Sequence, residues 1–516
     1  MNQNSRTSNV VRNLIGGVGG QLFTSILSFV CRTYFIKYLG ATYLGVNGLF
    51  ANILSLLSLA ELGIGPAIVF SMYKPIKDND EEHVARLMNF YKKAYRIIAV
   101  IVTVCGLALL PFLPYLIKDT TGIDNLRLIF VLILTNTSVS YLFAYKGSML
   151  NADQKSYICV IFRNIFAVVQ NIVQILLLIW TGNFLLYLIV QIITTFMANF
   201  VQAIYVDKKY PFLVKYKNSK IDKEEQQGIM KNVKGMMMHK VGGFVLNGTD
   251  NLVISKFVGI VAVGIYSNYL MIINLVKGYL KQITGSISAS VGNFIAKESK
   301  EKSYSIYNIV MFGHYWICGF CAVCFYVLFS PFIELWLGGE YLLTKPVLLV
   351  IIMNFYLYAV HAGNDTFINA SGLFWETKFK PIIESLVNLV VSIVLAYYIG
   401  LAGVFIGSVI AYLSTGWIEP RFLYKKLFEK NFILYLIKFF FFFFFTFGIA
   451  VGLEIGTTYL VGGALILQVL IRAVLVVLVY NIAVVAISWR SEEFKALLRY
   501  GKNFISKIGR RKKKWN

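Results

Sequence analysis

The sequence predicts an all-α, polytopic integral membrane protein with about 14 transmembrane helices. Of the 516 residues, 58% are hydrophobic and only 14% are charged, and the mean hydropathy is +0.68. Apolar runs of about 20 residues recur along the chain and are separated by short polar connections. The runs lack the period-two alternation of porin strands. A soluble multidomain protein is therefore excluded.

Each helix is expected where an apolar run begins. The first run follows a polar, weakly basic leader, but it lacks a small-residue cleavage site and is too long for a signal peptide. It is predicted to be a retained helix. The eighth run carries Lys277 and Lys281 in its second half. In chain order the runs start near Asn13, Leu44, Ile97, Leu126, Tyr157, Phe184, Gly235, Ile260, Ile306, Val347, Pro381, Leu401, Phe432 and Leu460.

The distribution of cations predicts the orientation of these helices. With the N-terminus inside, the cytoplasmic segments carry about 36 Lys and Arg residues, and the opposite loops carry about three, Lys37, Lys118 and Lys345. Both termini are then cytoplasmic. The net charge of +24 and the basic tail at 507–515 indicate contact with anionic inner-leaflet headgroups. No nucleic-acid partner is expected.

A repeat divides the chain into two halves. The motif KYLG-x4-GV at 37–46 follows Arg12-Asn13 by about 25 residues, and KFVG-x4-GI at 256–265 follows Lys231-Asn232 at the same interval. Six helices separate the copies, so the halves are predicted to be parallel, pseudo-symmetric six-helix bundles. The expected domains are an N-lobe (1–206), a cytoplasmic amphipathic linker (207–234), a C-lobe (235–430), accessory helices 13 and 14 (431–490) and a basic cytoplasmic tail (491–516).

Several short motifs follow one another along the chain in an order that is typical of one family. They are YLGVNGLFANILSLLSL (43–59), AELGIGPAI (60–68), YKPI (73–76), VGIYSNY (263–269), GLFW (372–375), KPIIE (380–384) and AGVFIG (402–407). Together they resemble the bacterial polysaccharide flippases of the multidrug/oligosaccharidyl-lipid/polysaccharide exporter (MOP) superfamily. The resemblance implies two six-helix bundles plus two extra helices.

The same resemblance implies a function and its partners. The expected task is to move an undecaprenyl-diphosphate-linked oligosaccharide across the bacterial cytoplasmic membrane by alternating access, for capsule, exopolysaccharide or O-antigen assembly. Polysaccharide polymerase machinery is an implied contact. Two alternatives of similar design remain open, a peptidoglycan-precursor lipid flippase and a cation-coupled multidrug exporter.

Charged side chains inside the predicted helices are the candidate functional groups, because a charge at mid-membrane costs about 2.5 to 3.5 kcal/mol on insertion scales. Cations prevail among them, which suits a diphosphate cargo better than a cationic drug. The set is Arg32, Glu61, Lys146, Arg163, Lys240, Asp250, Lys277, Lys281, His361 and Asp365.

Five cations are expected to bind the substrate diphosphate: Arg32, Lys146, Arg163, Lys277 and Lys281. Arg32 comes first, because a guanidinium can hold phosphate oxygens through two parallel hydrogen bonds. Lys277 and Lys281 are one turn apart and share a helix face, so they could form a two-point clamp. The alternative for each cation is structural: snorkelling of Arg32 to the outer headgroups, or anchoring at a helix end for the others.

Glu61 precedes Gly63, Gly65 and Pro66, a segment that predicts a bend and a hinge in the second helix. Two roles are open for the carboxylate, binding of an exchanged proton or sodium ion and pairing with Arg32. Asp250, His361 and Asp365 are further candidates for ion coupling or charge pairing. Helix–helix hydrogen bonding is the alternative for their polar surroundings.

No cofactor, metal site or enzymatic activity is expected. The sequence has no nucleotide-binding motif, and Cys318, Cys321 and Cys324 lie in an apolar helix without a further cysteine ligand nearby. A glycan polymerase would need a large outer loop, whereas no predicted outer loop exceeds about a dozen residues. Transport energy would then come from an ion gradient, the membrane potential or consumption of cargo. The seven phenylalanines at 439–445 are expected to face lipid.

Overall fold

The computed structural model describes residues 3–61, 64–119, 122–231, 233, 248–295, 297–460 and 462–500. These residues form helices and connecting turns without a strand, which confirms the predicted all-α class. Twelve helices in this part of the chain are long and apolar enough to cross a membrane. The chain forms two compact units, Met1–Gly264 and Ile265–Asn516.

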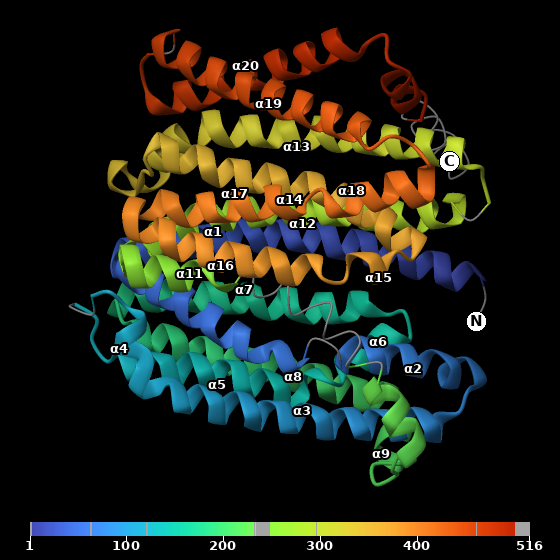
Figure 1. Ribbon diagram of the computed structural model, residues 1–516. Coiled ribbons are helices and arrows are strands. Elements are labelled where there is room, and N and C mark those ends of the chain that lie inside the picture. The colour runs from blue at the N-terminus through green and yellow to red at the C-terminus, as the bar shows by residue number, and fades with distance from the viewer. Residues whose placement is uncertain are drawn as a thin grey trace, which may run out of the picture. The chain divides into compact units, whose positions relative to one another are not determined.

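The first unit is built around long helices, of which α3, α5 and α8 run side by side (Figure 1). Residues 223–231 are also helical. The elements of the first unit are α1 (Gln3–Leu57), η1 (Ser58–Glu61), α2 (Ile64–Asp78), α3 (Glu81–Leu109), η2 (Leu110–Phe112), α4 (Leu113–Leu116), α5 (Leu126–Ala144), α6 (Gly147–Ala152), α7 (Ser156–Thr181), α8 (Phe184–Lys209), α9 (Phe212–Lys215), α11 (Asp250–Val253), η3 (Ile254–Val258) and the start of α12 (Ile260–Ile295).

The second unit contains the rest of α12 and the remaining helices, with α13, α19 and α20 running alongside one another (Figure 1). Its further elements are α13 (Lys300–Leu337), η4 (Gly339–Tyr341), α14 (Lys345–Ser371), α15 (Phe374–Thr377), α16 (Lys380–Ile399), α17 (Leu401–Thr415), α18 (Ile418–Phe422), η5 (Leu423–Phe428), α19 (Ile433–Leu460) and α20 (Leu465–Ser488).

Helix α1 contains two of the predicted helices. They meet at Gly40, whose φ of 74° and ψ of −179° are not helical, and the chain reverses direction there (Figure 1). A side chain is strained at such a positive φ, so glycine suits this position. The second part of α1 ends at Leu57, η1 ends at Glu61, and α2 starts at Ile64. The predicted second helix is therefore interrupted beside the Gly-Ile-Gly-Pro segment.

The two copies of the sequence repeat meet inside the first unit. A Cβ on Gly45 would lie 2.0 Å from the Ile260 carbonyl oxygen, and a Cβ on Gly264 would lie 2.0 Å from the Ala41 carbonyl oxygen. Ala41 and Ile260 each follow the first glycine of a repeat copy, so the two contacts are equivalent. Small residues allow backbones to approach this closely. The repeated glycines thus mark a symmetric helix crossing.

Most helices begin where the apolar runs predict. Helices α5, α8, α12 and α17 start at the predicted residue. Helix α3 starts at Glu81 instead of Ile97, because Asp80 caps it by accepting a hydrogen bond from the His83 backbone N–H at 3.0 Å. A search for apolar runs does not detect a first turn made of charged residues, so it places the start of such a helix too late. The predicted helix near Gly235 falls largely on 234–247, which lie outside the described residues.

Residues 223–231, within the expected linker, form a helix that packs inside the first unit. Ile229 and Val233 are buried, and Glu225 Oε1 lies 2.7 Å from the His83 Nε2 on α3. The hydrophobic side of the linker therefore covers protein at these two residues.

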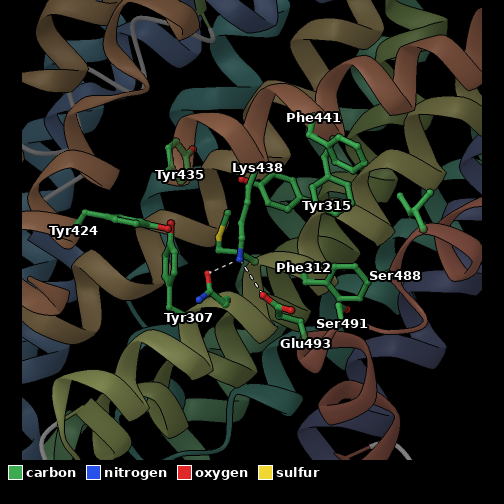
Figure 2. A pocket seen from close by; sticks show the side chains of 14 residues that line it. Tyr307, Phe312, Tyr315, Tyr424, Tyr435, Lys438, Phe441, Ser488, Ser491 and Glu493 are labelled. Atoms are coloured by element: carbon green, nitrogen blue, oxygen red, sulfur yellow. Dashed lines mark hydrogen bonds and ion pairs between the residues drawn. The ribbon is translucent and has the colours of Figure 1, made fainter. Parts of the chain in front are cut away.

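Helix α19 is joined by polar contacts to α13 and to the segment that follows α20. Lys438 on α19 donates hydrogen bonds to Asn308 Oδ1 at 3.2 Å and to Glu493 Oε1 at 2.9 Å, as Figure 2 shows. Burial acts to raise the pKa of the Glu493 carboxyl, but the hydrogen bond and charge of Lys438 hold that pKa below its ordinary value. Glu493 therefore stays ionised and keeps this contact.

The expectation that the phenylalanine run faces lipid is wrong for part of the run. Phe439 is buried, and Phe442 stacks on Tyr315 with the ring planes 9° apart. Phe440, Phe441 and Phe444 are exposed. Successive residues turn by about 100° around a helix, so seven in a row cover every face.

We predict that Gly264→Ala lowers the stability of the protein. The added Cβ must push apart two backbones, which costs about 1–3 kcal/mol in a packed interior. The midpoint of thermal unfolding in detergent should fall for Gly264→Ala and for Gly45→Ala. Gly448→Ala on α19 is the control, because no atom lies within 4 Å of its added Cβ. Equal midpoints for all three variants would contradict the close crossing.

Candidate functional site

A polar cavity of about 300 Å³ lies between α12, α13 and α14 of the second unit. Lys277 and Lys281 line it from α12, His314 from α13, and Tyr358 and Asp365 from α14. The Lys277 Nζ lies 4.2 Å from the centroid of the Tyr358 ring, a cation–π distance. The structure thus brings three of the predicted site residues, Lys277, Lys281 and Asp365, to one cavity.

Buried charges continue from Asp365 toward α16 and α18. The Lys380 Nζ lies 2.7 Å from Glu419 Oε2, and the two side chains are only 10% and 8% exposed. Asp365 hydrogen-bonds Glu419 and interacts electrostatically with Lys380. One turn after Lys380, Glu384 interacts with the same ammonium group and accepts a hydrogen bond from Thr415 Oγ1 at 3.1 Å. Three carboxyls therefore surround one ammonium group.

His361 belongs to the same charge cluster. It lies one turn before Asp365 on α14, is 5% exposed, and interacts electrostatically with Lys380. Its ring packs against Gly416, where a Cβ would lie 2.2 Å from the imidazole Cε1. The glycine therefore leaves the space that the imidazole fills.

In the first unit, Glu61 is held by tyrosine hydroxyls. Tyr95 Oη donates to Glu61 Oε1 at 2.5 Å, and Tyr91 Oη donates to Tyr95 Oη at 3.1 Å. Tyr141 also hydrogen-bonds Glu61. Ion pairs recorded within the described residues do not join Glu61 to Arg32. The half-buried Glu61 carboxylate is thus stabilised by neutral hydroxyl donors.

The remaining cations of the first unit have separate surroundings. Arg32 lies beside Tyr187 of α8 and next to Cys31. Lys146, at the end of α5, forms an ion pair with Asp207 of α8. Arg163 lines a cavity between α6, α7 and α8.

The structure describes three of five further predicted positions. Asp250 begins the short helix α11. Gly65 and Pro66 lie in the first turn of α2, and a Cβ on Gly65 would lie 2.8 Å from the Tyr91 hydroxyl. Gly63 and Lys240 lie outside the described residues.

Sequence reasoning missed several buried charges. Lys380 and Glu384 lie near the start of α16 and Glu419 lies near the start of α18, and only the fold shows that they converge. Glu454 and Arg472 lie within α19 and α20, where Arg472 Nη1 donates to Glu454 Oε2 at 3.2 Å and Lys345 also pairs with Glu454. Their opposite signs within two apolar runs were the available signal.

Comparison with known proteins places the chain in a family. The profile of the polysaccharide biosynthesis protein family matches residues 10–287, more than half of the chain. The chain belongs to this family. The match confirms the resemblance to the polysaccharide flippases of the MOP superfamily. No curated protein sequence matches the chain.

Solved structures show the same fold. The lipid II flippase MurJ in an inward closed conformation matches with a TM-score of 0.68 and 16% identity, over 92% of this chain and 100% of MurJ. An inward-facing multidrug resistance MATE family transporter of the MOP superfamily matches with 0.60 and 15%, over 77% and 92%. The Vibrio cholerae MATE transporter VcmN in the bent form matches with 0.53 and 16%, over 83% and 98%. This polysaccharide biosynthesis protein therefore has the fold of multi-pass transporters and flippases.

We predict that Lys380→Met destabilises the protein by about 3–5 kcal/mol, because it leaves buried carboxyls without their counter-ion. The matched control is Lys300→Met, which breaks the ion pair with Glu429. Those two side chains are 53% and 64% exposed, and exposed pairs contribute about 0–1 kcal/mol. Equilibrium unfolding in detergent measures both changes. Equal losses for the two variants would show that the Lys380 cluster does not stabilise the fold.

Proposed function

We propose that the protein flips an undecaprenyl-diphosphate-linked oligosaccharide from the inner to the outer leaflet of the bacterial cytoplasmic membrane. The observation that carries this proposal is the cavity beside Lys277 and Lys281 in a chain of the polysaccharide biosynthesis family. Such a cargo has a diphosphate and a polar glycan that need shielding from hydrocarbon, whereas its polyprenyl tail can stay in lipid.

The two lysines suit a diphosphate in spacing and charge. Side chains one turn apart on a helix lie about 5–6 Å from each other, so each ammonium can bind one phosphate. The cavity has two lysines and one carboxylate, and Asp365 already hydrogen-bonds Glu419. Two ammonium groups against one carboxylate give the lining a net positive charge, which suits an anionic ligand. A site for a cationic drug would have the opposite balance.

The depth of the cavity suits loading from the inner leaflet. Lys277 lies about 25 Å along α12 from Ile260, and Asp365 lies about 30 Å along α14 from Lys345, at 1.5 Å per residue. Both starts belong to the outer side in the orientation that the cations predict. With both termini in the cytoplasm, the cavity then opens near the leaflet where the cargo is made.

Ion coupling is proposed for the charge cluster next to this cavity. Glu384 and Glu419 are buried, and with Asp365 the three carboxyls around Lys380 would carry two uncompensated negative charges if all were ionised, which is costly for the buried pair. A bound proton or sodium ion would reduce this imbalance. Asp365 connects the cluster to the cavity, so cargo and ion would influence each other there. Glu61, held by tyrosines, and Asp250 are secondary candidates in the first unit.

The other predicted residues keep supporting roles in this proposal. Arg32 would add a cation for the diphosphate, while Lys146 is less available because Asp207 neutralises it. Gly63, Gly65 and Pro66 would form the hinge beside Glu61 as the protein alternates between its open states. The basic tail would bind anionic inner-leaflet lipids, and polymerase machinery would receive the flipped cargo.

We predict that the double variant Lys277→Ala/Lys281→Ala loses affinity for undecaprenyl diphosphate. Hydrogen bonds to charged groups contribute about 1.5–3 kcal/mol each, so the dissociation constant should rise about tenfold or more. Binding to the purified protein in nanodiscs measures it. The control variant Lys300→Ala/Lys302→Ala removes the same charge from the start of α13 and should bind undecaprenyl diphosphate with unchanged affinity. An unchanged dissociation constant for the first variant would refute the clamp.

We predict that Asp365→Asn uncouples transport from the ion gradient. Wild-type transport in liposomes should accelerate under an imposed proton or sodium gradient, because ion binding at the cluster drives one step of the cycle. Asp365→Asn should transport at one rate with and without the gradient. Asp124→Asn, in an exposed loop, is the control. A variant that still responds like the wild type would exclude Asp365 from coupling.

A further inference from the structure

A second polar cavity, of about 490 Å³, lies entirely within the first unit. Residues of the short helix α6 and of the long helices α7 and α8 line it. Its volume falls in the range of small-molecule sites, about 300–1,000 Å³. The cation pattern predicts that Arg163 binds the substrate diphosphate, but it assigns no role to the neutral polar residues of this cavity.

Seven of the 13 lining residues have neutral polar side chains. Ser156 and Gln170 contribute from α7, and Thr195, Asn199 and Gln202 contribute from α8. Arg163 is the single charged residue among the lining residues. The cavity beside Lys277 contains two cations and a carboxylate instead. The two cavities therefore suit different parts of a ligand.

The polar groups occupy one face of each helix. Ile161 and Ile165 on α7, and Ile193 and Met197 on α8, are exposed on the opposite faces. Apolar side chains there suit lipid, whereas amides and hydroxyls are costly against lipid. The polar faces of α7 and α8 therefore line a space for water or a polar ligand.

Helix packing uses few of these groups. Thr194 Oγ1 donates to Gln170 Oε1 at 3.0 Å, which joins α8 to α7. Within the described residues, Asn199 donates only to the Thr195 carbonyl of its own helix, at 3.1 Å. Gln202 and Arg163 make no hydrogen bond or ion pair with the described part of the chain. Donors and acceptors thus remain available on both walls.

We propose that this cavity is a carbohydrate subsite that binds the glycan of the lipid-linked cargo, an inference that rests on the proposed function. Sugar hydroxyls both donate and accept hydrogen bonds, as amides and hydroxyls do. Arg163 donates to sugar oxygens without a competing carboxylate in the lining. A site built to hydrogen-bond hydroxyls rejects ligands that lack them, so this cavity selects among glycans.

The first test compares two ligands of the purified full-length protein. They are undecaprenyl diphosphate and the lipid-linked oligosaccharide extracted from cells that express the protein. Asn199→Leu and Gln202→Leu should weaken binding of the oligosaccharide lipid about tenfold, with less than about a twofold effect on undecaprenyl diphosphate. Gln191→Leu lies on α8 outside the cavity and should change neither affinity. Equal weakening of both ligands, or of neither, overturns the subsite.

The second test reads the cavity directly through Cys159, which lines it. The oligosaccharide, released from its diphosphate by mild acid, should slow alkylation of Cys159 by N-ethylmaleimide several-fold and leave Cys105 unchanged. Mass spectrometry measures both rates. Protection of Cys159 without binding of either lipid would refute the proposed function and keep the subsite. Binding of both lipids without protection would keep the proposed function and refute the subsite.

Discussion

The cost of placing charge in a low-dielectric membrane governs this structure. Some charges in the described spans are met by a partner, as Lys380 is by Glu419 and Arg472 is by Glu454. Others line a polar cavity, as Lys277, Lys281 and Arg163 do. Each paired charge already interacts with an opposite charge within the protein. Charges that line a cavity border a space that a ligand can enter, and for this reason the proposed cargo sites lie at those cavities.

The same pairs hold the helices in place. Arg472 and Glu454 join α20 to α19, and Lys345 connects them to the start of α14. Lys438 and Glu493 fasten the other end of α19 near α13. The two C-terminal helices are thus integral to the second unit. Because each pair joins two helices, the contacts that neutralise these charges also hold the helices together.

Sequence patterns predict local features of this protein and not its long-range contacts. The starts of α8 and α17 follow from apolar runs, and the shared face of Lys277 and Lys281 follows from helical spacing. The position of Asp365 opposite those lysines depends on how α12 packs against α14, which spacing does not specify. Similarly, Glu61 had two predicted partners, yet it accepts a hydrogen bond from Tyr95 on α3. Tyrosine hydroxyls escape a search for opposite charges, because they are neutral.

The most direct test of the central claim is transport by the purified protein in liposomes. A fluorescent lipid-linked oligosaccharide would be placed in one leaflet, and its exposure to a membrane-impermeant quencher would be followed over time. Our account predicts that the wild-type protein moves this lipid to the other leaflet and does not move cationic dyes. Dye movement by a protein that leaves the lipid in its original leaflet would contradict the account and identify a drug exporter.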